Sequence, residues 1–198
     1  MRPDPNARPE YVEAFRKIAA RIAAAIGGLP AAALPIKMYV AGGAALHFYT
    51  GERVSRDIDA VFSRRIALPD QLEIAYRDAD GASQLLYFDR QYSDTLALMH
   101  EDAHEDSVPL SLTGIDPRKL DVRLLSPLDL AVSKLSRFSE QDRDDIATLA
   151  RRKLIKAAAL QTRAEQALGE YVGNTGRIQG NIGQALRIVD DTARRHSK

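Results

Sequence analysis

The sequence predicts a mixed α/β fold followed by a C-terminal helical region, and two patterns carry this prediction. Before residue 126, short apolar runs bounded by glycine or polar residues are typical of strands, and they alternate with stretches of helical spacing. From Leu128 onward, nearly all of the chain shows helical spacing. Ser126-Pro127 marks the change, because proline suits the first turn of a helix.

These patterns divide the chain into three parts. Residues 1–9 are rich in proline, asparagine and arginine, so we predict a disordered arm. Residues 10–125 are predicted to form the α/β domain, and residues 126–198 the helical region. A chain of 198 residues is long enough for one substantial domain and a small appendage.

The elements of the α/β part follow from apolar spacing and from the glycines that end them. Val12, Phe15, Ile18 and Ile22 recur at helical spacing, and Gly27 is a natural stop for that helix. The elements predicted in order are a helix over residues 10–26, a strand over 36–41, a short helix over 44–49 that Gly51 ends, a strand over 58–62, a helix over 68–77, and strands over 85–88, 95–99 and 120–125.

The helical region divides at a clear break, the Gly-Asn-Thr-Gly segment at residues 173–176. Three helices are predicted before this break and one after it. Their predicted ranges are 128–138, 141–152, 156–172 and 181–195.

Composition excludes several classes of protein. The 28 basic and 27 acidic residues nearly balance, so no overall charge indicates a nucleic-acid partner. The absence of cysteine excludes disulfides and thiolate metal sites. No apolar run reaches the roughly 20 residues needed to cross a bilayer, and residues 1–10 lack the apolar core of a signal peptide. We therefore predict a cytoplasmic protein with no membrane partner.

The stretch over residues 39–62 has the most chemical content. Gly42-Gly43 follows a predicted strand and precedes a helix, so the backbone can turn tightly and free N–H groups can bind a phosphate. Asp57 and Asp59 lie two apart at the start of the next strand, so their side chains project from one face. Two such carboxylates repel each other unless a cation lies between them.

The cation that suits this pair of aspartates is Mg²⁺ or Mn²⁺. Oxygen ligands with room for phosphate oxygens are typical of these ions. Such an ion neutralises a triphosphate and polarises the attacked phosphorus. The sequence therefore predicts a metal-dependent site for a nucleoside triphosphate (NTP).

The segment GGAAL…TGERVSRDID resembles the signature of the nucleotidyltransferase superfamily, and more narrowly that of the AbiEii-type and related minimal nucleotidyltransferases. A second block, residues 126–146, is similar to the same family: Lys134 matches its helix lysine, and Asp142 and Asp145 match its paired acids. The resemblance implies a nucleotidyltransferase-like mixed sheet flanked by helices, followed by a C-terminal helical region.

The resemblance also implies an activity, which is transfer of a nucleoside monophosphate from an NTP to an acceptor with release of pyrophosphate. The implied acceptors are a tRNA 3′ end or a protein hydroxyl, and the implied partner is the other member of a toxin–antitoxin or phage-defence pair. The residues with implied roles are Asp57 and Asp59 for the metal; Gly42, Gly43, Arg53, Ser55 and Lys134 for the nucleotide; and Asp57, Asp59, Lys134 and Asp145 for catalysis.

The superfamily usually places a third carboxylate on a later strand. Asp102, which follows the strand predicted over residues 95–99, is the predicted third metal ligand, and Asp121 and Asp89 also fit. If none of them converges with the aspartate pair, the alternative is a catalytically incomplete module that binds nucleotide and acts through a protein partner.

A remote alternative comes from His100-Glu-Asp-Ala-His104, which matches the H-E-x-x-H pattern of zinc hydrolases. In that pattern two histidines one helical turn apart bind Zn²⁺, and the glutamate acts as general base. The residues before His100 alternate like a strand and Pro109 follows closely, so this context favours an acidic turn over a zinc site.

Overall fold

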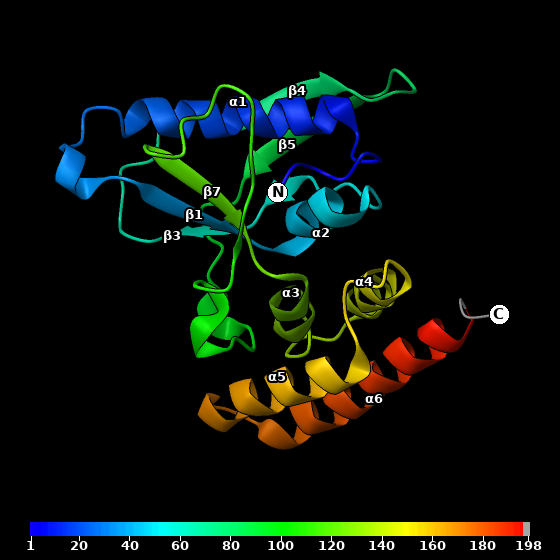
Figure 1. Cartoon of the computed structure of the whole chain (residues 1–198). Helices are drawn as coiled ribbons and strands as arrows, with labels where there is room; N and C mark the ends of the chain where they lie inside the picture. The colour runs from blue at the N-terminus through cyan, green and yellow to red at the C-terminus, as the bar shows by residue number, and fades with distance from the viewer. Residues whose placement is uncertain (196–198) are drawn as a thin grey trace. The chain divides into compact units, whose positions relative to one another are not determined.

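The computed structural model describes residues 1–195, which form helices and two small sheets (Figure 1). The chain divides into two compact units. The first unit consists of residues 1–92 and 107–124, and the second of residues 93–106 and 125 onward. The mixed sheets and the helices after residue 126 confirm the predicted fold class. The predicted domain boundaries stay a prediction.

One sheet of the first unit is built around the apolar strand β1. Its strands, in spatial order, are β3 (Ala60–Phe62), β1 (Ile36–Val40), β7 (Leu120–Leu124) and β6 (Val108–Pro109). β1 runs parallel to β7 and antiparallel to β3. The register pairs Val40 with Ala60 on one side and with Leu124 on the other. The C-terminal end of β1 therefore lies beside Asp59, the residue that precedes β3.

The other sheet has three strands. In spatial order they are β2 (Asp57–Ile58), β5 (Ser83–Phe88) and β4 (Glu73–Arg77). β2 runs parallel to β5, and β4 runs antiparallel to it. The strand predicted over residues 58–62 is thus divided at Asp59, because the residues before it pair with β5 and those after it pair with β1. This division places Asp59 at the junction of the two sheets.

Helix α1 (Pro9–Ala25) covers one face of the three-stranded sheet (Figure 1). Its buried side chains recur at helical spacing, as predicted, and burying that face removes apolar surface from water. On β5, Leu86 and Phe88 are buried and alternate with Leu85 and Tyr87, which are exposed. One face of this sheet is therefore covered by α1 and the other is exposed.

Helix α2 (Gly42–Thr50) begins at the first glycine of the pair, two residues before its predicted start at residue 44. Every residue after Gly42 is buried, including the polar His47 and Thr50. Gly51, in the left-handed conformation, ends the helix as predicted.

Residues 68–77 do not form the predicted helix. Their last part forms strand β4, which pairs with β5 across a tight turn at residues 78–81. Ile74 and Tyr76 are the less exposed residues of β4 and alternate with exposed neighbours, so the period is two. Long-range pairing with β5 therefore decides the conformation of this segment.

Residues 95–99 do not form the predicted strand either. A short 3₁₀ helix, η2 (Asp94–Leu96), stands at this point, and the Ser93 side chain accepts a hydrogen bond from Thr95 N. Such local side-chain bonds compete with strand pairing. The other 3₁₀ helices of the described residues are η1 (Ala31–Ala33) and η3 (Glu101–Ala103).

The helices predicted after residue 126 are present, with some different ends. They are α3 (Pro127–Ser133), α4 (Glu140–Arg151), α5 (Ala157–Glu170) and α6 (Thr175–Arg195). α3 ends before the predicted residue 138, and α6 begins before the predicted residue 181. Ser139 and Asp142 form a capping box that starts α4. None of the helices over residues 1–195 combines the length and the apolar composition that crossing a bilayer requires.

The segment predicted as a disordered arm, residues 1–9, makes specific contacts with α2. Asp4 N donates to Phe48 O at 2.8 Å, and Arg8 N donates to His47 Nε2 at 3.0 Å. These bonds fix the chain where it leads into α1.

Candidate functional site

The turn between β1 and α2 is in direct contact with Asp59. Gly42 has φ of +57°, a left-handed conformation that favours glycine. A Cβ atom added at Gly42 would lie 1.9 Å from Asp59 Oδ2. Ala41 N also donates to Asp59 O at 2.8 Å. The carboxylate of Asp59 therefore lies on the backbone of the glycine turn, where a side chain would displace it.

Gly43 makes a second close contact, with the loop that follows α2. A Cβ atom added there would lie 2.4 Å from Arg53 Nη2 and 2.7 Å from Ser55 Cβ. Arg53 itself has φ of 33°, which is unfavourable for a residue with a side chain. Such strain persists where the surroundings hold it, often at functional sites. The loop after α2 therefore places the Arg53 guanidinium against the first turn of that helix.

Asp57 is tied to the same loop, because the Ser55 hydroxyl donates a hydrogen bond to Asp57 Oδ1. Ser55 is buried and Asp57 half-buried. Six residues that the sequence predicts for the site are therefore joined by direct contacts in the first unit. They are Gly42, Gly43, Arg53, Ser55, Asp57 and Asp59.

Tyr11 of α1 is a neighbour of this site that the sequence patterns do not single out. Its side chain is fully buried, and its hydroxyl has no hydrogen-bond partner among the described residues. Burial raises the pKa of Tyr11 far above its usual range, and the nearby Tyr76, Asp57 and Asp59 raise it further. Because Tyr11 falls on the apolar face of α1, its spacing predicts only a core residue.

His47 anchors the start of the site loop. It is fully buried, its Nε2 accepts from Arg8 N, and its Nδ1 lies 2.9 Å from Glu52 O. Since a carbonyl can only accept, the proton is on Nδ1 and the ring is neutral. Burial lowers the pKa of His47, which favours this state. Glu52 directly precedes Arg53, so His47 fixes the loop that carries the guanidinium.

The aspartate pair and its surroundings fit a hard divalent cation. Asp57 and Asp59 supply carboxylate oxygens, the donors that Mg²⁺ and Mn²⁺ prefer, and the missing side chain of Gly42 lets the Asp59 carboxylate lie against the glycine turn. Among residues 1–195, no group of three or more histidine, aspartate or glutamate side chains is arranged to hold a metal ion. The predicted three-ligand set with Asp102 stays a prediction.

Asp121, which also fitted the place of a third carboxylate, lies far along the sheet from the pair. The register places it opposite Lys37, whereas Asp59 lies beside Ala41. Four residues of strand separate the two positions, a distance of about 13 Å. Asp121 Oδ2 accepts instead from Arg123 Nη1 at 3.1 Å. Asp121 therefore does not complete the aspartate pair.

Asp89 lies closer to the pair. Its N–H donates to Ile58 O at 3.1 Å, which continues the parallel register of β2 and β5 by one position and sets Asp89 beside Asp59. Its Oδ1 accepts from Gln91 N at 2.8 Å. Asp102 belongs to the second unit, where its side chain is exposed.

The second block of the family resemblance forms a buried ionic network in the second unit. Lys134 Nζ donates to Asp145 Oδ2 at 2.5 Å and lies 3.7 Å from Asp142 Oδ1. Arg137 and Ser139 donate to Asp142 as well. Burial opposes ionisation of Asp142, but these donors and the Lys134 charge outweigh it and lower its pKa to about 2. The structure thus joins Lys134 to Asp145, and their roles toward a nucleotide stay a prediction.

The H-E-x-x-H segment differs from the zinc-hydrolase arrangement. The residues between the histidines form only the short η3, whereas the zinc pattern requires an α-helical turn. His100 Nδ1 accepts from Asp102 N at 3.1 Å, and His104 Nε2 lies 3.0 Å from Asp94 Oδ2. Each histidine therefore has a local partner.

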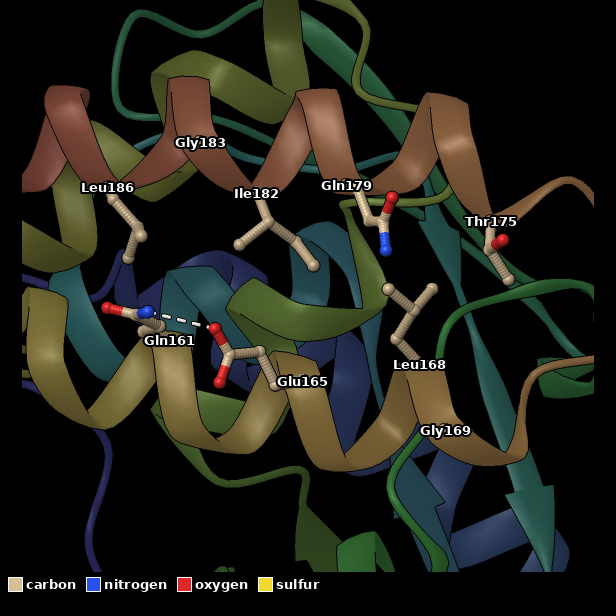
Figure 2. A pocket seen from close by; sticks show the side chains of 9 residues that line it. All are labelled: Gln161, Glu165, Leu168, Gly169, Thr175, Gln179, Ile182, Gly183 and Leu186. Atoms are coloured by element: carbon tan, nitrogen blue, oxygen red, sulfur yellow. Dashed lines mark hydrogen bonds between the residues drawn. The ribbon is translucent and has the colours of Figure 1, made fainter.

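A groove of about 610 Å³ lies between α5 and α6 of the second unit. Figure 2 shows Gln179, Ile182 and Leu186 of α6 pointing toward α5. Gln161 Nε2 donates to Glu165 Oε1 at 2.8 Å along its edge. Its lining includes one carboxylate and no cation, so it does not suit a triphosphate.

The fold and the site together define a class of protein. A strand that ends in a glycine turn, a helix, and an aspartate pair on the returning strand form the arrangement of a nucleotidyltransferase-type domain. Residues 20–178 match the family described as "Nucleotidyltransferase of unknown function (DUF6036)", and the chain belongs to this family. The match confirms the predicted superfamily, and the narrower AbiEii-type relationship stays a prediction. No curated protein and no solved structure matches the chain.

Proposed function

We propose that this chain is a metal-dependent nucleotidyltransferase that moves a nucleoside monophosphate from an NTP to an acceptor. The observation that carries the proposal is the packing of Gly42 and Gly43 against Asp59, Ser55 and Arg53. A phosphate-binding turn, a guanidinium group and two carboxylates meet there. The family supports the same class of reaction.

The triphosphate would bind at the start of α2. The first N–H groups of a helix have no acceptor within it, and the helix dipole favours an anion at that end. The Arg53 guanidinium lies against Gly43, in the same turn, and its positive charge favours phosphate groups there. These donors hold the phosphates without contacting the base, so they serve any NTP.

Asp57 and Asp59 would hold Mg²⁺ or Mn²⁺, which neutralises phosphate charge and polarises the attacked phosphorus. Ser55 orients Asp57 through its hydrogen bond to Oδ1, and the glycine turn fixes the position of Asp59. Both carboxylates are therefore held by the same segment that binds the phosphates.

In the proposed reaction the acceptor hydroxyl oxygen forms a bond to the α-phosphorus of the NTP. The bond from that phosphorus to the bridging oxygen breaks, pyrophosphate leaves with the electron pair, and the hydroxyl proton passes to water. Arg53 and the α2 N–H groups stabilise the charge on the phosphate oxygens. We also propose, on the family resemblance, that Lys134 and Asp145 contribute to the reaction.

The acceptor we propose is a tRNA 3′ end or a protein hydroxyl, and the setting is a toxin–antitoxin or phage-defence pair. Only the family resemblance supports these details. Incubation with each α-labelled NTP, Mg²⁺ and total RNA or lysate tests them, because label in RNA or in protein identifies the acceptor.

The same assay tests the site. We expect labelling to require Mg²⁺ and to be lost in Asp57→Asn and in Asp59→Asn. The matched control is Asp121→Asn, whose carboxylate lies on β7, separated from β3 by β1 and about 13 Å away along the strand direction. Its activity should stay within about twofold of the unmodified chain. Labelling that survives both pair substitutions would count against the proposal.

A second candidate function is nucleotide binding without transfer, in which the chain acts through a protein partner. The observation that favours it is that, among residues 1–195, no group of three or more histidine, aspartate or glutamate side chains is arranged to hold a metal ion. Binding of Mg²⁺–NTP that Asp57→Asn abolishes, with no label transferred from any NTP to RNA or protein, would identify this function.

A further inference from the structure

The exposed face of the three-stranded sheet carries two large apolar side chains next to the aspartate pair. Leu85 is 43% exposed and Tyr87 is 40% exposed. Their neighbours on β5, Leu86 and Phe88, are buried on the opposite face under α1. Exposed apolar side chains that adjoin each other mark a surface for a ligand or a partner more often than isolated ones do.

The strand register links this apolar pair to the proposed metal site. Tyr87 is the residue directly opposite Asp57 in the parallel pairing of β2 and β5. Residues opposite each other in a sheet project from the same face, and neighbouring strands lie about 4.8 Å apart. Leu85, two residues earlier on β5, projects from the same face. The register therefore places Tyr87 next to Asp57 on the same face of the sheet.

The parts of an NTP match the order of these groups in space, from the glycine turn through the aspartate pair to Tyr87. Its phosphates carry the charge that suits the glycine turn, Arg53 and a cation held by the aspartates. Its base is a flat aromatic ring, with faces suited to stacking, that one ribose separates from the α-phosphate. Aromatic side chains bind bases by stacking, and this contact tolerates any base because each has a π-face.

We infer that Tyr87 and Leu85 form a platform on which the base of the NTP stacks. The inference rests on the proposed function, because the phosphates must be held at the glycine turn for the base to reach this face. Tyr87 lies between Asp57 on β2 and Glu73 on β4, and both Tyr87 and Leu85 are uncharged, so these two side chains bind the four bases by area rather than by hydrogen bonds. Purine nucleotides should therefore bind more tightly than pyrimidine nucleotides.

A protein partner is the other occupant that this face could accept, since β4 is an edge strand of the same sheet. The proximity of Tyr87 to Asp57 favours the base, because a partner would have no reason to adjoin the carboxylates. The two possibilities predict different binding data. Only if the surface binds a base should its substitution weaken binding of a nucleotide and leave binding of a bare phosphate chain unchanged.

The experiment is calorimetric titration with Mg²⁺–ATP and, separately, with Mg²⁺–tripolyphosphate, which lacks ribose and base. The proteins are the full chain and its variants Tyr87→Ala, Tyr87→Phe and Asp57→Asn. Leu29→Ala is the matched control, because Leu29 is also an exposed apolar residue of the first unit, at 38% exposure. Melting temperatures verify that each variant is folded.

We expect Tyr87→Ala to weaken ATP binding by about tenfold or more and to leave tripolyphosphate binding unchanged. Tyr87→Phe keeps the ring and should bind ATP as the unmodified chain does. Asp57→Asn should weaken both ligands. Leu29→Ala should change neither.

Two results would overturn the platform alone. One is ATP binding that Tyr87→Ala leaves intact while Asp57→Asn abolishes it; the other is an equal loss of ATP and tripolyphosphate in Tyr87→Ala, which would place the ring at the phosphates. If the unmodified chain binds neither ligand, or if Asp57→Asn binds both unchanged, the proposed function fails, and the platform fails with it.

Discussion

The two units each contain a pair of aspartates, and their surroundings differ. In the second unit, Asp142 and Asp145 have side chains that are 1% and 3% exposed. Lys134 lies between them, with its Nζ 2.5 Å from one carboxylate and 3.7 Å from the other. The protein itself supplies the cation here.

In the first unit, Asp57 and Asp59 are half-buried, and their contacts include the Ser55 hydroxyl and the backbone of the glycine turn. The Ser55 hydroxyl orients Asp57, and Gly42 leaves space for Asp59. In the second unit the lysine neutralises carboxylates whose burial would otherwise destabilise the fold, whereas carboxylates on a turn at a sheet junction suit a cation that arrives with a ligand.

The largest expected effect is the loss of activity in Asp57→Asn of the first unit, with little loss of stability. Asp57→Asn should lower the rate of nucleotidyl transfer by about 1,000-fold or more, because it removes a metal ligand worth several kcal/mol in the transition state. Its melting temperature should stay within a few degrees of the unmodified chain. Initial rates and thermal melts check this. A variant that loses its fold together with its activity would make the two aspartate pairs alike.

The next largest effect is a loss of stability, which we expect from a substitution at Lys134 in the second unit. Lys134→Met should lower the free energy of unfolding by about 3–5 kcal/mol, because it leaves two buried carboxylates without their shared cation. Urea denaturation measures the loss. The control is Lys156→Met, since Lys156 is exposed and should change stability by less than about 0.5 kcal/mol. Equal stability of the two variants would show that the network contributes little.

A smaller effect tests the contact between the glycine turn and Asp59. Gly42→Ala should destabilise the chain by about 1–2 kcal/mol more than Gly81→Ala does. Both glycines have positive φ, so strain is common to both, but only at Gly42 would the new Cβ meet Asp59. Denaturation curves give the difference. Equal losses would mean that Asp59 moves aside without cost.

Another effect of similar size is on stability in acid. The pKa of Asp142 is lowered to about 2, well below the usual range of an aspartate, so its contribution is fully present above about pH 4 and is lost as pH falls toward 2. The loss should amount to about 2 kcal/mol. Unfolding free energies between pH 5 and 2 should therefore converge for the unmodified chain and Asp142→Asn. A constant gap would contradict this account.

The elements that the sequence predicts correctly are those that local patterns determine. α1 follows from its apolar stripe, and Gly51 ends α2 where a left-handed residue is needed. The helix predicted over residues 68–77 is wrong because pairing with β5 decides that segment. The division of one strand at Asp59 has the same cause, since its two halves pair with strands far apart in the chain.

The residues of the candidate site likewise include some that local sequence patterns predict and some that they do not. The glycine pair, Arg53, Ser55 and the aspartates lie within 18 consecutive positions, 42–59, so a local motif predicts their contacts. Tyr11 and Tyr87 come to the site through a helix and a strand far away in sequence, and each fits an ordinary core or surface pattern. No local signal distinguishes them.

The most direct test of the central claim, that the glycine turn and the aspartate pair form one metal–nucleotide site, is ATP titration with and without Mg²⁺. The proteins are the unmodified chain and Asp59→Asn. We expect binding that requires Mg²⁺ in the unmodified chain and is lost in the variant. Binding of equal affinity in the two proteins, or binding that Mg²⁺ does not change, would contradict the claim.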